Sequence, residues 1–113
     1  MAQNTVSDLR LKIFCALADP VRLDLIEYLS GGERCVCEIL PAFQRSQSSI
    51  SKHLNVLYQA GILDRRIEGK RTLYSIKDPH VLQVIKAVDA LALKQISLLI
   101  DAKKSIEEQI IRS

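Results

Sequence analysis

Two cysteines separated by a single residue have the clearest capacity for chemistry in this sequence. Cys35 and Cys37 lie in the stretch GGERCVCEIL, and Cys15 is the third cysteine of the chain. Thiolates bind soft ions, and they can also be oxidised. Three cysteines are too few for a disulfide framework, so we expect free thiols in a reducing compartment. The alternative is that Cys35 and Cys37 are small packing residues.

The spacing of the pair raises a geometric question. We expect a short helix over residues 33–40, ended by Pro41. Residues two apart on a helix point about 200° away from each other, whereas two thiolates on one ion lie roughly 4 Å apart. Binding of one ion by both sulfurs should therefore deform the first turn. A disulfide within the pair should also be disfavoured, so oxidation would need Cys15 or a second subunit.

Helical periodicity and capping residues predict the elements that position these thiols. Asp19-Pro20 should begin a helix that Gly31 and Gly32 end, and Ser46 should cap a helix whose inward row is Ile50, Leu54 and Leu57. The apolar pattern then changes to two short strands joined at residues 68–70. The prediction is a single domain, residues 1–113, that is mainly α with a small β-hairpin. Its expected parts are a first helix over about 7–18, a helix-turn-helix over about 33–60, a hairpin over about 62–77 and a last helix over about 79–111.

Charge is concentrated in the middle of the chain. Seven basic and two acidic residues lie between Arg45 and Lys77, a net charge of +5, whereas the whole chain of 113 residues carries only +3. A basic centre beside mildly acidic ends indicates that one face meets phosphate. No apolar run approaches a membrane span, and the opening MAQNTVSDL lacks the apolar core of a secretory signal. We therefore expect a cytoplasmic protein with no membrane partner.

The order of the predicted elements is that of a winged helix-turn-helix domain. The helix over 46–60 would leave short polar side chains for base edges and phosphates in the major groove, and the basic hairpin would grip the adjacent backbone as a wing. The alternative without DNA binding is an ordinary serine-capped helix and a charged surface that contacts only solvent. The predicted DNA-binding residues are Gln47, Ser48, Ser51, Lys52, His53, Asn55, Arg65, Arg66, Lys70 and Arg71.

The sequence resembles the ArsR/SmtB family of metal-responsive repressors in three segments. They are ALADPVRLDLIEYL, SQSSISKHLNVLYQAGIL and RRIEGKRTLYSI. The resemblance runs from about Leu9 to Leu93. It implies a homodimeric winged-helix repressor that leaves its operator, an imperfect inverted repeat, when an inducer binds. The dimer interface would lie on the first and last helices, the last having an apolar stripe too long for one small body to cover. Its predicted residues are Leu9, Ile13, Val81, Ile85 and Val88.

The arsenic-sensing branch of that family carries ELCVCDLC where this chain has ERCVCEIL. The resemblance implies As(III) or Sb(III) as inducer, with Cd(II) and Pb(II) as alternatives, and no organic cofactor. Cys35 and Cys37 match the first two cysteines, whereas the third falls on Leu40. Cys15 is the candidate third ligand, although packing in the core is at least as plausible for it. The family's zinc site on the last helix is disfavoured, because its second half falls on Leu91 and Lys94.

Three other functions are alternatives to a metal-responsive repressor. A repressor of the same fold could respond to thiol oxidation instead of a metalloid. A small thiol enzyme is disfavoured, because the sequence shows no Cys-x-x-Cys motif, phosphate loop or nucleophile–base set. A protein-interaction module that never touches DNA is opposed by the basic centre.

Overall fold

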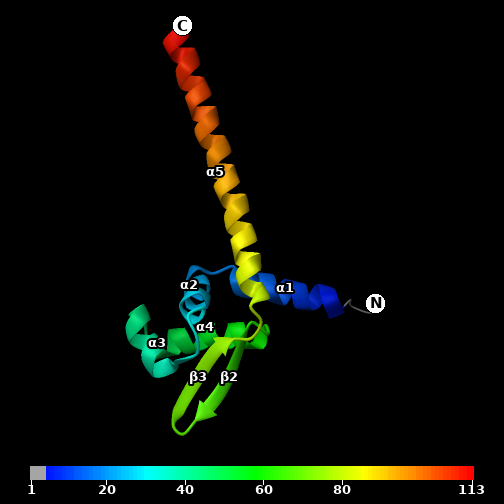
Figure 1. Cartoon of the computed structure of the whole chain (residues 1–113), viewed down its shortest axis with the longest axis vertical. Helices are drawn as coiled ribbons and strands as arrows, with labels where there is room; N and C mark the ends of the chain where they lie inside the picture. Colours follow the sequence, from blue (N-terminus) through cyan, green and yellow to red (C-terminus); the bar gives the residue numbers. More distant parts are fainter. Residues whose placement is uncertain (1–4) are drawn as a thin grey trace. The chain divides into compact units, whose positions relative to one another are not determined.

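The computed structural model describes residues 5–113, with side chains from Ser7 onward. It divides into one unit up to Pro79 and a second unit, His80–Ser113, and each is described by itself. The prediction of a mainly helical chain with a small β-hairpin is confirmed. The elements in chain order are α1 (Thr5–Leu17), α2 (Pro20–Leu29), β1 (Arg34–Cys35), α3 (Val36–Phe43), α4 (Gln47–Gln59), β2 (Leu63–Glu68), β3 (Arg71–Ile76) and α5 (His80–Arg112) (Figure 1).

The first unit is built around predicted helix caps and a predicted core. The Asp19 carboxylate accepts the backbone N–H groups of Val21 and Arg22 at 2.9 and 3.1 Å, so the Asp-Pro device begins α2 as expected. Ser46 caps α4 by accepting the Ser49 N–H at 3.2 Å. The inward row of α4 and the buried side chains of α2 are almost fully enclosed. They are Leu25, Ile26, Leu29, Ile50, Leu54 and Leu57.

The hairpin is part of a larger sheet than the sequence predicted. Strands β2 and β3 pair in antiparallel register from Leu63↔Ile76 to Glu68↔Arg71, with a two-residue turn in which Gly69 takes a φ of 61°. On the other side of β3, the short strand β1 pairs with Tyr74 and Leu73. Strand β3 is therefore the central strand, and the segment that carries the cysteines is joined to the wing by backbone hydrogen bonds.

Helix α3 differs from the prediction at both ends. It begins at Val36 instead of residue 33, because Arg34 and Cys35 are extended and pair with β3. It also continues through Pro41 to Phe43. Pro41 therefore lies inside the helix, where it removes one backbone donor, and Ile39 of the same helix is in the core with no exposed surface.

The second unit is the 33-residue helix α5. Its predicted range, 79–111, agrees with the observed range within a residue at each end. Many apolar side chains in its later turns are exposed, among them Leu91, Leu99, Ile106 and Ile110. None of the helices between residues 5 and 113 combines the length and the apolarity that a membrane span needs.

Candidate functional site

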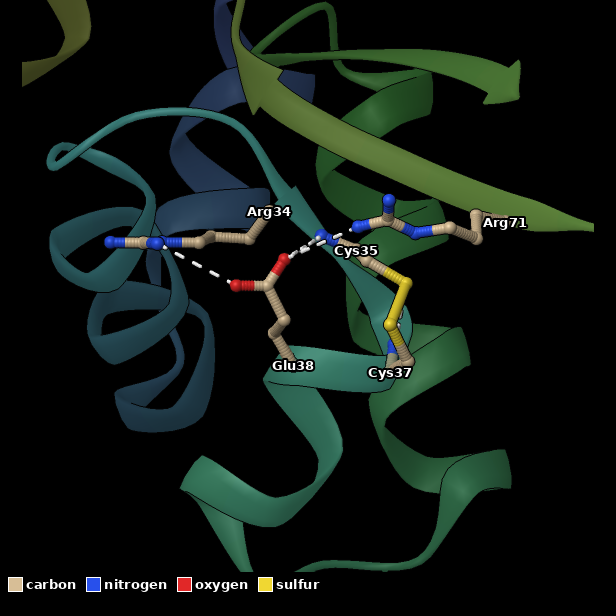
Figure 2. The surroundings of a disulfide bond; sticks show 5 residues. All are labelled: Arg34, Cys35, Cys37, Glu38 and Arg71. Carbon is tan, nitrogen blue, oxygen red and sulfur yellow. Dashed lines mark hydrogen bonds and ion pairs between the residues drawn. A yellow bond between two sulfur atoms is a disulfide. The ribbon is translucent and has the colours of Figure 1, made fainter. Parts of the chain in front are cut away.

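Cys35 and Cys37 lie at the start of α3, and their sulfurs point toward each other (Figure 2). Cys35 is the residue that caps α3, with φ −74° and ψ 148°, and only Cys37 belongs to the helix. The rule that separates residues two apart on a helix does not apply, because Cys35 precedes the helix. The two Cα atoms are 5.1 Å apart and the two sulfurs form a disulfide.

This geometry corrects two expectations. The sulfurs meet without any deformation of the first turn, so unwinding of α3 is not required for a ligand to contact both. A disulfide between Cys35 and Cys37 also needs neither Cys15 nor a second subunit. Both expectations failed for the same reason: the backbone turns from strand to helix between the two cysteines, which brings both side chains to one side.

A capping box built on sulfur holds the pair. The backbone N–H of Cys37 donates to Sγ of Cys35 at 3.0 Å, and the backbone N–H of Cys35 donates to Oε1 of Glu38 at 3.2 Å. The Glu38 carboxylate also lies 3.6 Å from Nη1 of Arg34 and 3.7 Å from Nη2 of Arg71, which belongs to the wing (Figure 2). Glu38 therefore contacts the cysteine segment and the wing at once.

Cys15 is exposed on α1, so its predicted alternative role as a packed core residue is wrong for the single chain. Within residues 5–113, no three or more His, Cys, Asp or Glu side chains gather where they could hold one metal ion. The structure thus does not bring Cys15 to the cysteine pair, and its role as a third ligand stays a prediction without geometric support.

A cavity of about 370 Å³ opens beside the cysteine pair. Its walls come from three parts of the first unit: the start of α3, the exposed side of α4, and the wing with its turn. The lining residues are Cys35, Val36, Cys37, Leu40, Gln47, Ser51, Lys70, Arg71, Thr72 and Tyr74. Four of these, on α4 and the wing, are also predicted DNA-binding residues.

The outer face of α4 is polar, as predicted. Five of the predicted DNA-binding side chains on it are exposed: Gln47, Ser48, Ser51, Lys52 and Asn55. Because the opposite face is locked into the core, the helix can present these short side chains without disturbing its packing. Their contact with bases stays a prediction.

His53 departs from this pattern. Its side chain is only 20% exposed, and Nδ1 lies 3.2 Å from Nη1 of Arg22 and 3.9 Å from the Asp19 carboxylate. Arg22 also donates to the backbone carbonyls of Ala16 and Cys15 at the end of α1, at 2.6 and 3.0 Å. We therefore assign His53 a structural role, in the contacts that hold α1, α2 and α4 together. The sequence showed the motif that contains Arg22 but not its partners.

The wing carries basic residues that already have partners. Arg66 donates to both oxygens of Glu33 at 2.7 and 2.8 Å, and its Nη1 lies 3.1 Å from Glu68. The hydrogen bond to Arg66 holds the pKa of the Glu33 carboxyl below its ordinary value. Arg65 stacks on Tyr58 of α4, with Cζ 4.0 Å from the ring centre. These contacts fix the wing against the rest of the first unit, so phosphate contacts there would compete with them.

The predicted dimer residues fall into three classes. Leu9 on α1 and Val88 on α5 are 54% and 55% exposed, and Ile13 and Ile85 are half-buried. Val81 is only 9% exposed within the single chain and so offers little surface to a partner.

Sequence comparison places these features in a family. Residues 19–65 match the family described as bacterial regulatory protein, arsR family. An uncharacterised HTH-type transcriptional regulator of Methanocaldococcus jannaschii is 43% identical over 81 residues, which cover 71% of this chain and 91% of that protein. The chain belongs to the ArsR family.

Two other relatives have names that specify an element. The probable mercury resistance operon repressor of Streptomyces lividans is 36% identical over 88 residues, covering 78% of this chain and 70% of that protein. The arsenical resistance operon repressor of Escherichia coli is 40% identical over 74 residues, covering 65% of this chain and 62% of that protein.

The fold agrees with that of a solved winged helix-turn-helix domain. The solution structure of a homodimeric winged helix-turn-helix DNA-binding domain from Mycobacterium bovis, a possible ArsR-family regulator, has a TM-score of 0.70 and 29% identity, and the match covers 81% of this chain and 90% of that chain. The fold of this chain is therefore a winged helix-turn-helix. Its family and fold are those of DNA-binding transcriptional regulators, which rules against a thiol enzyme.

Proposed function

We propose that this ArsR-family chain is a cytoplasmic repressor that releases its operator when a soft metalloid binds the thiolates of reduced Cys35 and Cys37. Arsenite or antimonite is the favoured inducer, with Cd(II) and Pb(II) as alternatives. The carrying observation is that both sulfurs meet at the N-terminus of α3 on a cavity shared with α4 and the wing. The arsenical resistance repressor of E. coli, at 40% identity, supports the choice of element.

The cysteine pair fits a soft ligand by its chemistry. Reduced thiols supply two soft donors from one short segment, and the N-terminus of α3 favours their thiolate form. Cys37 is exposed and Cys35 is 3% exposed, so a ligand can reach the pair from one side. A third donor from the same chain is not required, because solvent or part of the ligand can fill that position.

Binding at this site has a short route to the predicted DNA surface. The backbone of Cys35 pairs with Leu73 in the central strand of the wing, and Glu38 contacts Arg71. Gln47 and Ser51 of α4 line the same cavity as the cysteines. A ligand on the sulfurs would therefore move the wing or crowd α4 directly. We propose this route in place of helix unwinding, with a coupling of about 1 to 3 kcal/mol.

We propose that the working form is a homodimer, as in the M. bovis domain. Exposed apolar side chains on α1 and α5, including Leu9 and Val88, provide the surface for a second copy. Two-fold symmetry would place two α4 helices about one DNA turn apart, so the operator should be an imperfect inverted repeat.

Operator-binding titration tests the proposal. Reduced wild-type protein should release operator DNA when As(III) is added, and the double variant Cys35→Ser, Cys37→Ser should bind DNA normally but stay bound. Cys15→Ser serves as the matched control and should respond like the wild type. Parallel titrations with Sb(III), Cd(II) and Pb(II) rank the inducers. Release of the double variant by As(III) would show that the inducer binds elsewhere.

A second candidate function, response to thiol oxidation, is favoured by one observation, the disulfide between Cys35 and Cys37. Oxidation would then replace the metalloid as the signal at the same site. Operator affinity of the reduced and oxidised protein, with the disulfide checked by non-reducing mass spectrometry, separates the two candidates. Equal affinity of both forms would remove this alternative.

A further inference from the structure

Arg65 lies on β2, where the wing meets α4. Its guanidinium carbon, Cζ, is 4.0 Å from the centre of the Tyr58 ring near the end of α4. In the antiparallel pairing of β2 with β3, Arg65 stands directly opposite Tyr74, so the two side chains share one face of the sheet. One planar cation therefore connects the helix that is predicted to enter the major groove with the central strand of the wing.

The two partners of Arg65 hold it in different ways. Tyr58 offers the face of its ring, to which a guanidinium is attracted. The Tyr74 side chain forms a hydrogen bond with Arg65, and this bond raises the pKa of Arg65 above its ordinary value. Tyr58 is half-buried and Tyr74 is 6% exposed, so their surroundings fix both rings. The long side chain of Arg65 is thus held between two rigid groups.

The next residue of β2 uses its guanidinium in a similar way. Successive side chains of a strand point to opposite faces, and Arg66 donates to both oxygens of Glu33, which precedes β1. Both arginines of the strand therefore join the wing to other parts of the first unit. A phosphate that drew the Arg65 guanidinium off the Tyr58 ring would break the contact between the wing and α4.

We propose that Arg65 is a positioning residue for DNA binding, which sets the wing relative to α4 instead of serving as a phosphate contact. A winged domain binds with one helix in the major groove and the wing on the adjacent backbone, so the placement of these two elements must match the duplex. Loss of the Arg65 contacts lets the wing move and weakens specific binding. This inference rests on the proposed DNA binding by α4 and the wing, and it does not depend on the inducer.

A double-mutant cycle between Arg65 and Tyr58 tests the proposal. The probe is a duplex that the reduced wild-type protein selects from a random-sequence pool, and no inducer is added. Arg65→Lys keeps the charge but loses the planar group that stacks on the ring, and Tyr58→Leu removes the ring without changing any charge. Each should lower affinity for the selected duplex about tenfold, equal to about 1.4 kcal/mol. The double variant should lose little more than either single variant, because both remove the same contact.

A second readout separates positioning from charge. Non-specific DNA binding depends mainly on the number of cations that meet phosphates. Arg65→Lys and Tyr58→Leu leave that number unchanged, so affinity for a scrambled duplex of the same length should stay near that of the wild type. The ratio of specific to non-specific affinity should therefore fall in both variants.

Two further variants serve as controls. Tyr58→Phe keeps the ring and should bind the selected duplex within about twofold of the wild type. Lys52→Ala changes an exposed side chain of α4 that makes no part of the stack, and its loss of affinity should add to that of Tyr58→Leu. Urea unfolding of every variant checks that it is folded under the conditions of the titration.

Three results would overturn the positioning role of Arg65. They are wild-type affinity in Arg65→Lys, a loss of about a hundredfold in the double variant, as two independent contacts would give, and a loss in Tyr58→Phe as large as in Tyr58→Leu. Each would leave the proposed function intact. A wild-type protein that selected no duplex from the pool would instead contradict the proposed function itself.

Discussion

Helices α2 and α3 begin in similar ways but with different chemistry. Both are capped by a residue with extended backbone, Asp19 for α2 and Cys35 for α3. The Asp19 carboxylate accepts two backbone N–H groups, whereas the sulfur of Cys35 accepts one, from Cys37. An ionised carboxylate is a strong acceptor and sulfur is a weak one. The cap of α2 is thus strong. The cap of α3 is weaker, and its acceptor is a sulfur that can also form a disulfide or bind a ligand.

The surroundings increase this difference. Asp19 lies beside Arg22 and His53, which tie α2 to α1 and α4. The hydrogen bond from the Arg22 backbone N–H lowers the pKa of Asp19 from its ordinary value, so the cap stays charged in mildly acidic solution. The sulfur of Cys35 instead bonds to that of Cys37, and Cys35 lines the cavity. A strong cap serves stability, and a weak, reactive cap is suited to a signal.

The largest expected effect separates capping from ligand binding at Cys35. Cys35→Ser keeps a side-chain acceptor for the Cys37 N–H, so the free energy of unfolding of the reduced protein should change by no more than about 1 kcal/mol. The response to inducer, a factor of about 5 to 150 in operator affinity, should disappear. Operator titration and urea unfolding measure the two quantities. If Cys35→Ser lost the response and also lost much more than about 1 kcal/mol of unfolding free energy, the sulfur would be needed for the fold.

The second effect concerns the strong cap. Asp19→Ala should lower the free energy of unfolding by about 1 to 2 kcal/mol, because two backbone donors lose their acceptor. Urea unfolding at one fixed protein concentration measures it. Asp24→Ala, an exposed site on the same helix, is the control and should change stability by less than about 0.5 kcal/mol. A cost for Asp19→Ala no greater than that of the control would remove the contrast between the caps.

A smaller effect should appear on acidification. Because the folded pKa of Asp19 is lowered, its stabilising contribution is complete above the unfolded pKa and is lost as the pH falls through the folded pKa. The stability difference between wild type and Asp19→Asn should therefore shrink as the pH falls from 7 toward about 3, near the ordinary range of aspartate. Urea midpoints across this range measure it. A difference that stayed constant with pH would contradict the assigned cap.

The smallest effect is expected at Glu38. Glu38→Gln removes the ion pairs with Arg34 and Arg71 but keeps an oxygen that can accept the Cys35 N–H. These side chains are 39% to 52% exposed, so water screens the ion pairs and the loss in unfolding free energy should be below about 1 kcal/mol. The same unfolding assay applies. A loss above about 2 kcal/mol would show that the sulfur cap depends on this charge.

Local signals in the sequence predicted the strong cap and missed the weak one. Asp19-Pro20, Ser46 and the inward row of α4 carry their structural meaning within a few residues, so the winged helix-turn-helix was predictable. Cys35 was placed inside a helix because its pairing with Leu73 joins positions far apart in the chain. The partners of Arg66 and His53, Glu33 and Arg22, are also distant. Side-chain contacts of this kind cannot be read from periodicity or spacing.

Strand β1 is joined to β3 by two backbone pairs, Arg34↔Tyr74 and Cys35↔Leu73. Backbone pairing depends little on which side chains occupy the strand. Under the proposed function, the side chains that bind the inducer lie in one short contiguous segment, so they can be replaced while the backbone pairing of this segment with β3 remains. If the proposed function holds, substitutions at these few positions should change which ligand the protein responds to without changing how the segment is joined to the wing.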